Sequence, residues 1–472
     1  RTTLATLVLT AIVILPTTTM FGATPATSPG VTLPAYQTIK LPNGATILLA
    51  EKHDVPLIAF TAILRGGALA DPAGKEGTAS LTADLLEKGA GKQNAAQFAE
   101  AVDSVGGVLG ESARAEWISI RGEFLTRDTD LMLGLLSDML RRPAFATEEF
   151  TKLRDRDIDS LKAAKDSDLR SLIGTYANAF LFGSNLYGRP TDGSEASLAG
   201  IERQDVLNYY KNNFGADRLV LAVVGDFKAK EIESKLRAAL GDWNKAAAAA
   251  PKAKAMAAVE GRRVLLVDKP DATQTYFWIG NVGVRRNDPQ TPAIDLANTV
   301  FGGRFTSLIN SALRIESGLT YGAFSRNVTA TEPGSIGIAS YTKTDSTGKA
   351  VDMALDVLTK YEKEGITADA LKSSQAYILG QYPPDLETGS QLAARLAEIE
   401  FYGLGRNDVD AYGPAISAAS QQDVNNVIKR LYADPKNLTF VFIGKAEAIR
   451  DVVKKYGPVT EMKITDPTFS PK

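Results

Sequence analysis

The chain has 472 residues, of which 44% are hydrophobic and 23% charged, and its formal net charge is −2. This length exceeds one ordinary hydrophobic core and predicts two to four domains of a folded globular protein. The nearly neutral charge, without a basic stripe, excludes a general attraction to nucleic acid or to an anionic membrane surface. Cysteine is absent and His53 is the only histidine, so the usual ligands of catalytic zinc are almost entirely missing.

The first residues predict export. An apolar run at residues 4–15 follows Arg1, and small residues follow at 22–26. This order is typical of a secretory signal peptide. As a helix the run would reach only about 18 Å, which is short of a roughly 30 Å hydrocarbon core. We therefore expect a signal peptide and tail over residues 1–34, no stable membrane span, and a periplasmic protein.

The next segments predict strands followed by helices. Asn43 and Gly44 favour a hairpin turn, because this pair adopts the positive φ angles that such turns need. His53 lies in a polar turn, where we expect an exposed residue. Acidic and basic residues alternate at 155–159, which predicts a solvated helix face. The periodicity of apolar residues predicts strands at 45–50, 57–64 and 219–225, and helices at 95–105, 130–140 and 148–164.

The second half ends in the same way as the first. Each half closes with a Gln-Asp-Val sequence, an amphipathic helix and an apolar strand that ends in glycine. The distance from Asp205 to Asp423 is 218 residues, and the distance from Gly225 to Gly444 is 219 residues. This agreement indicates a duplication, and the order of elements predicts an α+β fold. We expect an N-terminal domain over 35–244, a linker rich in alanine and lysine over 245–260, and a C-terminal domain over 261–462.

A segment of the first half resembles a zinc-binding helix that has lost its ligands. Residues 77–89 read GTASLTADLLEKG. They are similar to the H-x-x-E-H helix of the pitrilysin/insulinase family of zinc metallopeptidases. The two histidine positions fall on Ser80 and Asp84, and the general-base glutamate falls on Ala83. The family takes its third ligand, a glutamate, from a helix about 75 residues further on, but residues 150–194 contain no glutamate.

The resemblance implies a fold of two homologous halves, each a duplicated α+β unit, that form a half-shell around a substrate chamber. It does not imply a zinc site in this chain. Ser80 and Asp84 would share a helix face, but one hydroxyl and one carboxylate make a poor zinc site. Ser80 is also a weak candidate nucleophile, since no histidine is available to activate it.

A second segment resembles the part of the same family that binds substrate. Residues 313–322 read LRIESGLTYG, similar to the family's R/Y element. In that element an arginine and a tyrosine seven residues further on bind the peptide backbone beside the scissile bond, from the half opposite the zinc. Arg314 and Tyr321 carry the match. A guanidinium donates to carbonyl oxygens, and a phenol can stabilise charge on a tetrahedral intermediate. Gly302 and Gly303 lie upstream, either as a substrate-gating loop or, more simply, as tight packing.

The loss of one set of residues and the retention of the other predicts a non-catalytic subunit of a heterodimeric metallopeptidase. The resemblance implies that the chain has no cofactor of its own and pairs with a homologous, zinc-bearing H-x-x-E-H subunit. It would close the chamber of that partner and bind short unfolded peptides through Arg314 and Tyr321. A stand-alone peptide-binding or assembly protein with no part in hydrolysis is the alternative. An enzyme with other chemistry at Ser80 and Asp84 is a third hypothesis.

Overall fold

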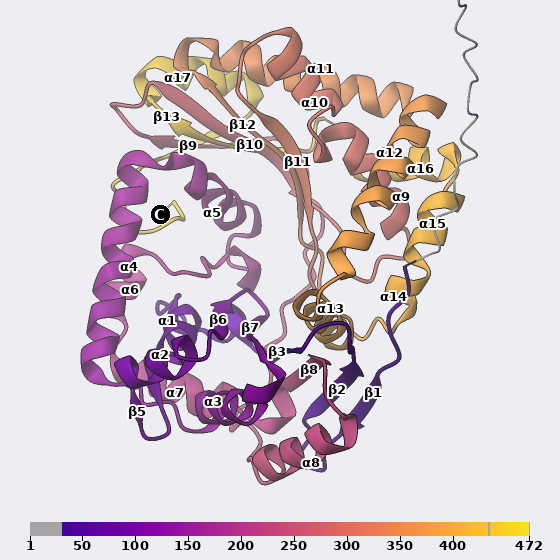
Figure 1. Cartoon of the computed structure of the whole chain (residues 1–472). Coiled ribbons are helices and arrows are strands. Elements are labelled where there is room, and N and C mark those ends of the chain that lie inside the picture. The colour runs from indigo at the N-terminus through magenta and orange to yellow at the C-terminus, as the bar shows by residue number, and fades with distance from the viewer. Residues whose placement is uncertain (1–30, 433–434, 472) are drawn as a thin grey trace, which may run out of the picture. The chain divides into compact units, whose positions relative to one another are not determined.

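The structure is a computed structural model that describes residues 31–432 and 435–471 (Figure 1). The expected signal peptide and most of the expected tail lie outside these residues. The described part belongs to one compact unit, which contains two six-stranded sheets and the helices that cover them. The predicted α+β fold is confirmed. No helix within the described ranges is both long enough and apolar enough to cross a membrane.

The first sheet has the order β1-β2-β8-β3-β7-β6. Strands β2 and β8 run parallel, and every other neighbouring pair is antiparallel. The predicted hairpin turn joins β1 to β2: Gly44 has a φ of 103°, and its N–H donates to the carbonyl of Leu41 at 2.9 Å. The strands are β1 (Gln37–Lys40), β2 (Thr46–Glu51), β3 (Leu57–Arg65), β6 (Val108–Ala113), β7 (Trp117–Leu125) and β8 (Leu219–Gly225).

The second sheet repeats this arrangement, with the order β11-β12-β10-β13-β9-β14. Here β9 runs parallel to β13, and β10 lies antiparallel between β12 and β13. Five consecutive strands of each sheet therefore have the same order and directions, which supports the duplication. The strands are β9 (Arg263–Asp268), β10 (Gln274–Val282), β11 (Ala323–Val328), β12 (Ser335–Lys343), β13 (Thr439–Gly444) and β14 (Val459–Lys463).

The helices at the end of each half also correspond. Helices α7 (Arg203–Asn213) and α16 (Gln421–Leu431) both begin with a capping box. In each box an aspartate in the first turn accepts a hydrogen bond from the backbone N–H of the residue before the helix. Asp205 does so at 2.8 Å and Asp423 at 2.9 Å. The shared Gln-Asp-Val sequence is thus a helix-start signal that both halves retain.

The three helices predicted in the first half are confirmed as α2, α3 and α4. The first-half helices are α1 (Thr78–Leu85), α2 (Ala95–Asp103), α3 (Thr129–Arg141), α4 (Thr147–Ser167), α5 (Leu169–Phe182), α6 (Glu195–Gly200), α7 and α8 (Ala229–Leu240). Those of the second half are α9 (Thr291–Asn298), α10 (Leu308–Asn310), α11 (Thr347–Glu364), α12 (Ala368–Gln381), α13 (Gly389–Tyr402), α14 (Asn407–Asp410), α15 (Tyr412–Ala418), α16 and α17 (Ala446–Val453).

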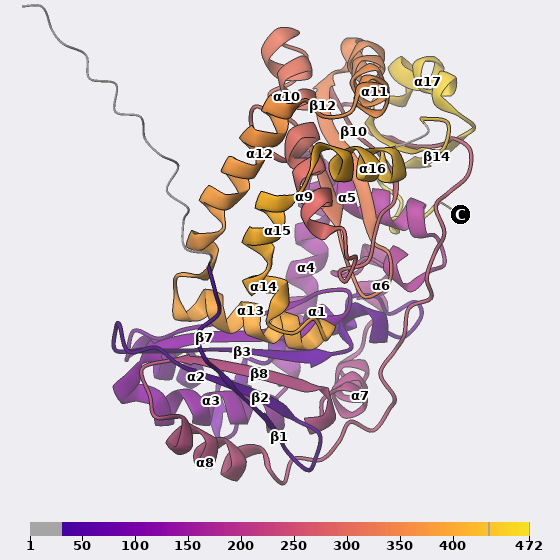
Figure 2. The same ribbon diagram turned by 90° about the vertical axis from the view of Figure 1, so that its right-hand side faces the viewer.

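Each half supplies one helix to the sheet of the other. Helix α13 packs on β3 and β8 of the first sheet, and α5 packs on β10 and β13 of the second (Figures 1 and 2). Leu392 and Leu396 of α13 share one buried cluster with Leu48 and Val220, whereas Ile173 of α5 joins the cluster of the second sheet. This exchange buries both faces of β8 and joins the two halves through hydrophobic contacts.

The connection between the halves contains no helix or strand from the end of α8 to the start of β9. Its backbone is nevertheless held along the surface. The N–H of Ala246 donates to Asp217 Oδ1 at 2.8 Å, and the carbonyl of Lys254 accepts from Asn185 at 2.8 Å. The domain limits at 244 and 261 remain predictions, although one sheet ends before this connection and the other begins after it.

Candidate functional site

The start of helix α1 is fixed by a buried aspartate. The two carboxylate oxygens of Asp71 accept hydrogen bonds from the N–H groups of Gly77 and Ala79, both at 2.8 Å. Gly77 has a φ of 99°, and a Cβ at this position would lie 3.0 Å from the Cα of Gly193. The glycine is therefore required both for its backbone angle and for its close packing. These contacts hold α1 firmly enough to position its side chains.

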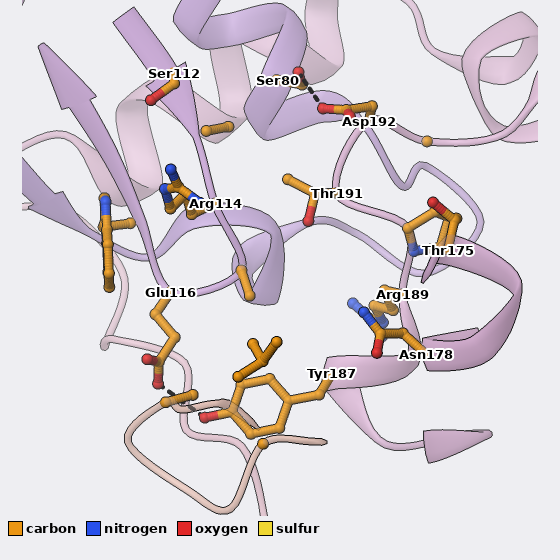
Figure 3. Close-up of a pocket in the computed structure, with 18 of the residues that line it drawn as sticks. Ser80, Ser112, Arg114, Glu116, Thr175, Asn178, Tyr187, Arg189, Thr191 and Asp192 are labelled. Carbon is orange, nitrogen blue, oxygen red and sulfur yellow. Dashed lines mark hydrogen bonds between the residues drawn. The ribbon is translucent and has the colours of Figure 1, made fainter. Parts of the chain in front are cut away.

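The three degenerate positions of α1 have different surroundings. Ser80 donates a hydrogen bond from its hydroxyl to Asp192 Oδ1 at 3.1 Å (Figure 3). Ala83 is completely buried in the core of the first half. Asp84 lines the same cavity as Ser80 and accepts a hydrogen bond from Arg156 at 3.1 Å. Ser80 and Asp84 thus share a helix face, as their spacing predicts.

A guanidinium bridges α1 and α4 at this face. Arg156 donates to Asp84 and also, through its Nε at 3.0 Å and Nη2 at 2.9 Å, to Asp157 Oδ1. The predicted solvated face over residues 155–159 is confirmed, since the side chains of Asp155, Arg156 and Asp159 are exposed, and only Asp157 of the charged residues is partly covered. Burial raises the pKa of Asp84, and the charge of Asp157 adds to the rise while Arg156 opposes it.

This set of donors does not fit zinc. The Ser80 hydroxyl is bonded to Asp192, and the carboxylates of Asp84 and Asp157 both contact a guanidinium, whose positive charge disfavours a divalent cation. Across the described ranges, no group of three histidine or acidic residues could hold a metal ion. The single imidazole is committed elsewhere: His53 is 56% exposed between β2 and β3, with Nδ1 at 2.7 Å from Asp226 Oδ1. This confirms the expected exposed turn. Hydrogen bonds with Asp226 and then Glu51 raise the pKa of His53.

The same arrangement gives no support to Ser80 as a nucleophile. Its hydroxyl contacts a carboxylate, and His53 has other partners and does not line the cavity. An activated serine needs a base within hydrogen-bond reach that is in turn held by a third group.

Two further carboxyl groups lie close to Asp84 and were not found from the sequence. Glu111 of β6 lines the cavity and faces Glu87, which follows α1. Burial, hydrogen bonding with Glu87 and the charges of Glu87 and Asp84 raise the pKa of Glu111 strongly. The pair therefore favours retention of a proton between the two carboxyl groups. Residues 24 positions apart in a chain carry no local signal for such a pair.

The cavity beside α1 has a volume of about 1090 Å³ and is lined by both halves. One wall contains Glu116, a buried residue directly before β7 (Figure 3). Its carboxylate accepts hydrogen bonds from the hydroxyls of Tyr187 at 2.8 Å and Tyr402 at 3.1 Å, and from the N–H of Thr331 at 3.1 Å. Thr331 lies in the turn between β11 and β12, and Tyr402 is the last residue of α13. Glu116 therefore connects the first half to two segments of the second half through hydrogen bonds.

The R/Y positions lie on a different surface. Arg314 belongs to a π-helical turn, Ser311–Glu316, and Tyr321 follows a loop that folds back on this turn. The N–H of Leu319 donates to the carbonyl of Leu313 at 2.9 Å, with Gly318 at a φ of 63° between them. π-helical turns are often found at functional sites. Neither Arg314 nor Tyr321 lines the cavity that contains Ser80.

Both side chains are free to bind. The guanidinium of Arg314 lies 4.6 Å from the ring centroid of Phe305 and has no hydrogen bond or ion pair with any residue that the structure describes. Tyr321 is 78% exposed, and its hydroxyl likewise has no described partner. Stacking fixes the position of the guanidinium while leaving its five N–H donors available.

Close packing explains the glycine at position 302. A Cβ on Gly302 would lie 2.4 Å from the backbone nitrogen of Ser325, so any side chain would force the π-helical turn Thr299–Gly303 away from β11. This supports tight packing rather than a gating loop at this residue. Gly303 is exposed and is less closely confined.

Comparison with known proteins assigns both halves to one family. A sequence model of the insulinase family, peptidase family M16, matches residues 47–187, and a model described as the peptidase M16 inactive domain matches residues 200–377. The uncharacterized zinc protease YmxG of Bacillus subtilis is 20% identical over 399 residues, which are 84% of this chain and 96% of the relative. A non-peptidase homolog YmxG of Helicobacter pylori is 23% identical over 402 residues, with coverage of 84% and 91%.

Solved structures agree in fold. The peptidase M16 inactive domain from Pseudomonas fluorescens has a TM-score of 0.80 at 21% identity and covers 87% of this chain and 98% of its own. A protease from Helicobacter pylori also has a TM-score of 0.80, at 18% identity, with coverage of 87% and 100%. These two matches show the fold. The two sequence models, over residues 47–187 and 200–377, show that the chain belongs to peptidase family M16, the insulinase family.

Proposed function

We propose that this chain is the non-catalytic subunit of a heterodimeric M16 metallopeptidase. It binds the backbone of an unfolded peptide through Arg314 and Tyr321 and presents that peptide to a homologous, zinc-bearing subunit, whose chamber it closes. The observation that carries the proposal is the state of Arg314: its guanidinium is held against Phe305, and no residue that the structure describes uses its donors.

The chemistry of the pair suits a peptide near a reacting carbonyl. A guanidinium donates two parallel hydrogen bonds, which suits carbonyl oxygens of an extended backbone. The phenol of Tyr321 can donate to an oxygen that becomes negatively charged in a tetrahedral intermediate. Neither group supplies a nucleophile or a base. On this proposal the zinc ion that activates the attacking water belongs to another chain, since Ser80, Asp84 and Arg156 do not form a zinc site.

The names of two relatives differ in whether they describe a peptidase. The Bacillus relative is named a zinc protease, whereas the Helicobacter relative is named a non-peptidase homolog. The absence of histidine and glutamate from the degenerate motif of this chain supports the reading as a non-peptidase. On this proposal the zinc belongs to the partner, and the pairing takes place in the periplasm, the destination that the expected signal peptide predicts.

The test is reconstitution. The chain and the H-x-x-E-H homologue from the same organism are purified separately and mixed, and the mass of the product is measured by size exclusion with light scattering. Cleavage of a quenched-fluorescent unfolded peptide is followed for each protein alone and for the mixture. We expect a one-to-one complex, no chelator-sensitive turnover by this chain alone, and faster turnover by the mixture. Failure to pair, with an unchanged rate in the mixture, would leave the stand-alone peptide-binding protein as the better account.

A further inference from the structure

Exposed apolar side chains are concentrated around Arg314. The described residues include eight large hydrophobic side chains that are exposed, and four of them lie within residues 305–321. Besides Tyr321 these are Phe305, Leu308 and Ile315, which are 60%, 42% and 57% exposed. Single exposed hydrophobic residues are ordinary, but a contiguous group marks a binding surface.

A fifth exposed residue is joined to this group by a second stacked arginine. Arg304 lies over the ring of Tyr377 at 5.9 Å and donates to Ser373 of the same helix, α12, at 3.0 Å. The backbone carbonyl of Phe305 accepts a hydrogen bond from Asn310 at 2.6 Å. The ring of Tyr377 and the backbone at Phe305 thus have contacts within the chain before any ligand arrives, and such order lowers the entropy lost on binding. We call Phe305, Leu308, Ile315 and Tyr377 the apolar platform.

The platform is continuous with the donors of Arg314. Because the guanidinium lies directly against Phe305, any group that binds it must also lie beside Phe305. In an extended peptide, residues are about 3.3 Å apart and alternate side chains share one face. A peptide whose carbonyl is held by Arg314 therefore places a neighbouring side chain near Phe305. An extended peptide suits this geometry, because its backbone carbonyls are unpaired along its length, whereas most carbonyls of a folded surface are already hydrogen-bonded.

We infer that the apolar platform selects peptides with an aliphatic or aromatic side chain next to the backbone segment bound by Arg314. This inference rests on the proposed function and adds a substrate class to it. Arg314 supplies affinity for any peptide backbone, and the platform supplies preference among peptides.

Two labelled peptides of about ten residues test the inference by fluorescence anisotropy with the full chain. They share a serine- and glycine-rich sequence and differ only in a central Leu-Phe or Ser-Thr pair. Burying one or two such side chains predicts at least about tenfold tighter binding of the Leu-Phe peptide. In Ile315→Ser combined with Leu308→Ser this preference should fall to about threefold or less. Val55→Ser is the control, because Val55 is 51% exposed in the other half, and it should keep the full preference.

The two failures are distinguishable. In Arg314→Ala both peptides should bind more weakly by a similar factor, and unchanged binding of both would refute the proposed function. An unchanged preference in the Ile315 and Leu308 variant, despite a circular dichroism spectrum like that of wild type, would overturn the platform alone. Equal binding of both peptides by wild type, or binding of neither, would also overturn it. If the platform variant instead converts a dimeric chain to a monomer in light scattering, the occupant is a second copy and the inference is wrong.

Discussion

Replacing Arg156 by methionine tests how the degenerate zinc helix is held to α4. Methionine keeps an apolar stem but removes the guanidinium that contacts Asp84 and Asp157, whose side chains are 29% and 23% exposed. Exposed ion pairs contribute about 0.2–1 kcal/mol, whereas removing one partner of a fully buried pair costs about 3–5 kcal/mol. The partial burial of both carboxylates, and the exposure of Arg156 itself, place the expected loss at about 1–2 kcal/mol of unfolding free energy near pH 7.5.

This loss should become smaller in acid. Burial raises the pKa of Asp84 above its unfolded value, so protonation of Asp84 stabilises the fold. That stabilisation is complete below the unfolded pKa of about 3.9 and is lost as the pH rises through the folded pKa. Removing Arg156 raises the folded pKa further, because Arg156 opposes the rise in the wild type. The variant therefore recovers stability, relative to wild type, as the pH falls through that raised value.

The assay is urea unfolding followed by tryptophan fluorescence at about pH 7.5 and about pH 5. Lys162→Met is the matched control, because Lys162 is also on α4, is 58% exposed and, among the described residues, pairs only with the exposed Asp159 at 3.3 Å. The control should lose less than about 0.5 kcal/mol at either pH. Equal losses in the two variants, or a loss for Arg156→Met that does not change with pH, would refute the cross-link between α1 and α4.

Three further predictions concern other parts of the chain. NMR titration of His53, the only histidine, should give a pKa above its ordinary value of about 6.5, and this pKa should fall in Asp226→Asn. The stabilisation of the fold by protonated His53 is complete below the unfolded pKa and is lost as the pH rises through the folded pKa. An equal pKa in both proteins would contradict this prediction. Leu396→Ala should lower the free energy of unfolding by about 2.7–5 kcal/mol, because the side chain of Leu396 on α13 is fully buried against the first sheet. A loss below about 1 kcal/mol would show that the helix exchange is not a main source of stability. The double variant Ser80→His, Asp84→His should bind no stoichiometric zinc in native mass spectrometry, because a third ligand is missing and the guanidinium of Arg156 remains. One tightly bound zinc per chain would contradict this prediction.

Local chemistry explains what could be predicted of the fold. Asn43 and Gly44 specify a hairpin turn through their backbone preferences, and Asp205 and Asp423 specify two helix starts through their caps. These signals act within about four residues, so the sequence alone is sufficient to find them. The 218-residue repeat then predicts that whatever fold one half adopts, the other adopts as well.

The exchange of α5 and α13 could not be predicted in the same way. The strands at 219–225 and 439–444 are apolar at almost every position, which indicates that both faces are buried. That pattern requires a second layer but does not say which segment provides it. Glu116 is similar: its partners Tyr187, Thr331 and Tyr402 are between 71 and 286 residues away. Such contacts depend on the completed fold.

The same distinction between local signals and long-range contacts applies to the candidate site. Arg314 and Tyr321 were found through their spacing in a motif, and Ser80, Ala83 and Asp84 through theirs. The role of Phe305 beneath Arg314, and of Arg156 beside Asp84, needed the structure, because each contact is made by a side chain outside the motif. A cation close to a degenerate metal position is a signal that sequence inspection could look for in other chains.

The most direct test of the central claim is the kcat/KM of the reconstituted heterodimer with Arg314→Ala in this chain. Arg326→Ala is the control, since Arg326 is also stacked on a phenylalanine, Phe324, and has no described ion pair or hydrogen bond. Loss of hydrogen bonds from a charged donor, about 1.5–3 kcal/mol, predicts a fall in kcat/KM of about 10- to 150-fold for Arg314→Ala and wild-type activity for Arg326→Ala. Equal activity of the two variants, in complexes of the same zinc content, would contradict the claim that this chain supplies Arg314 to the reaction of its partner.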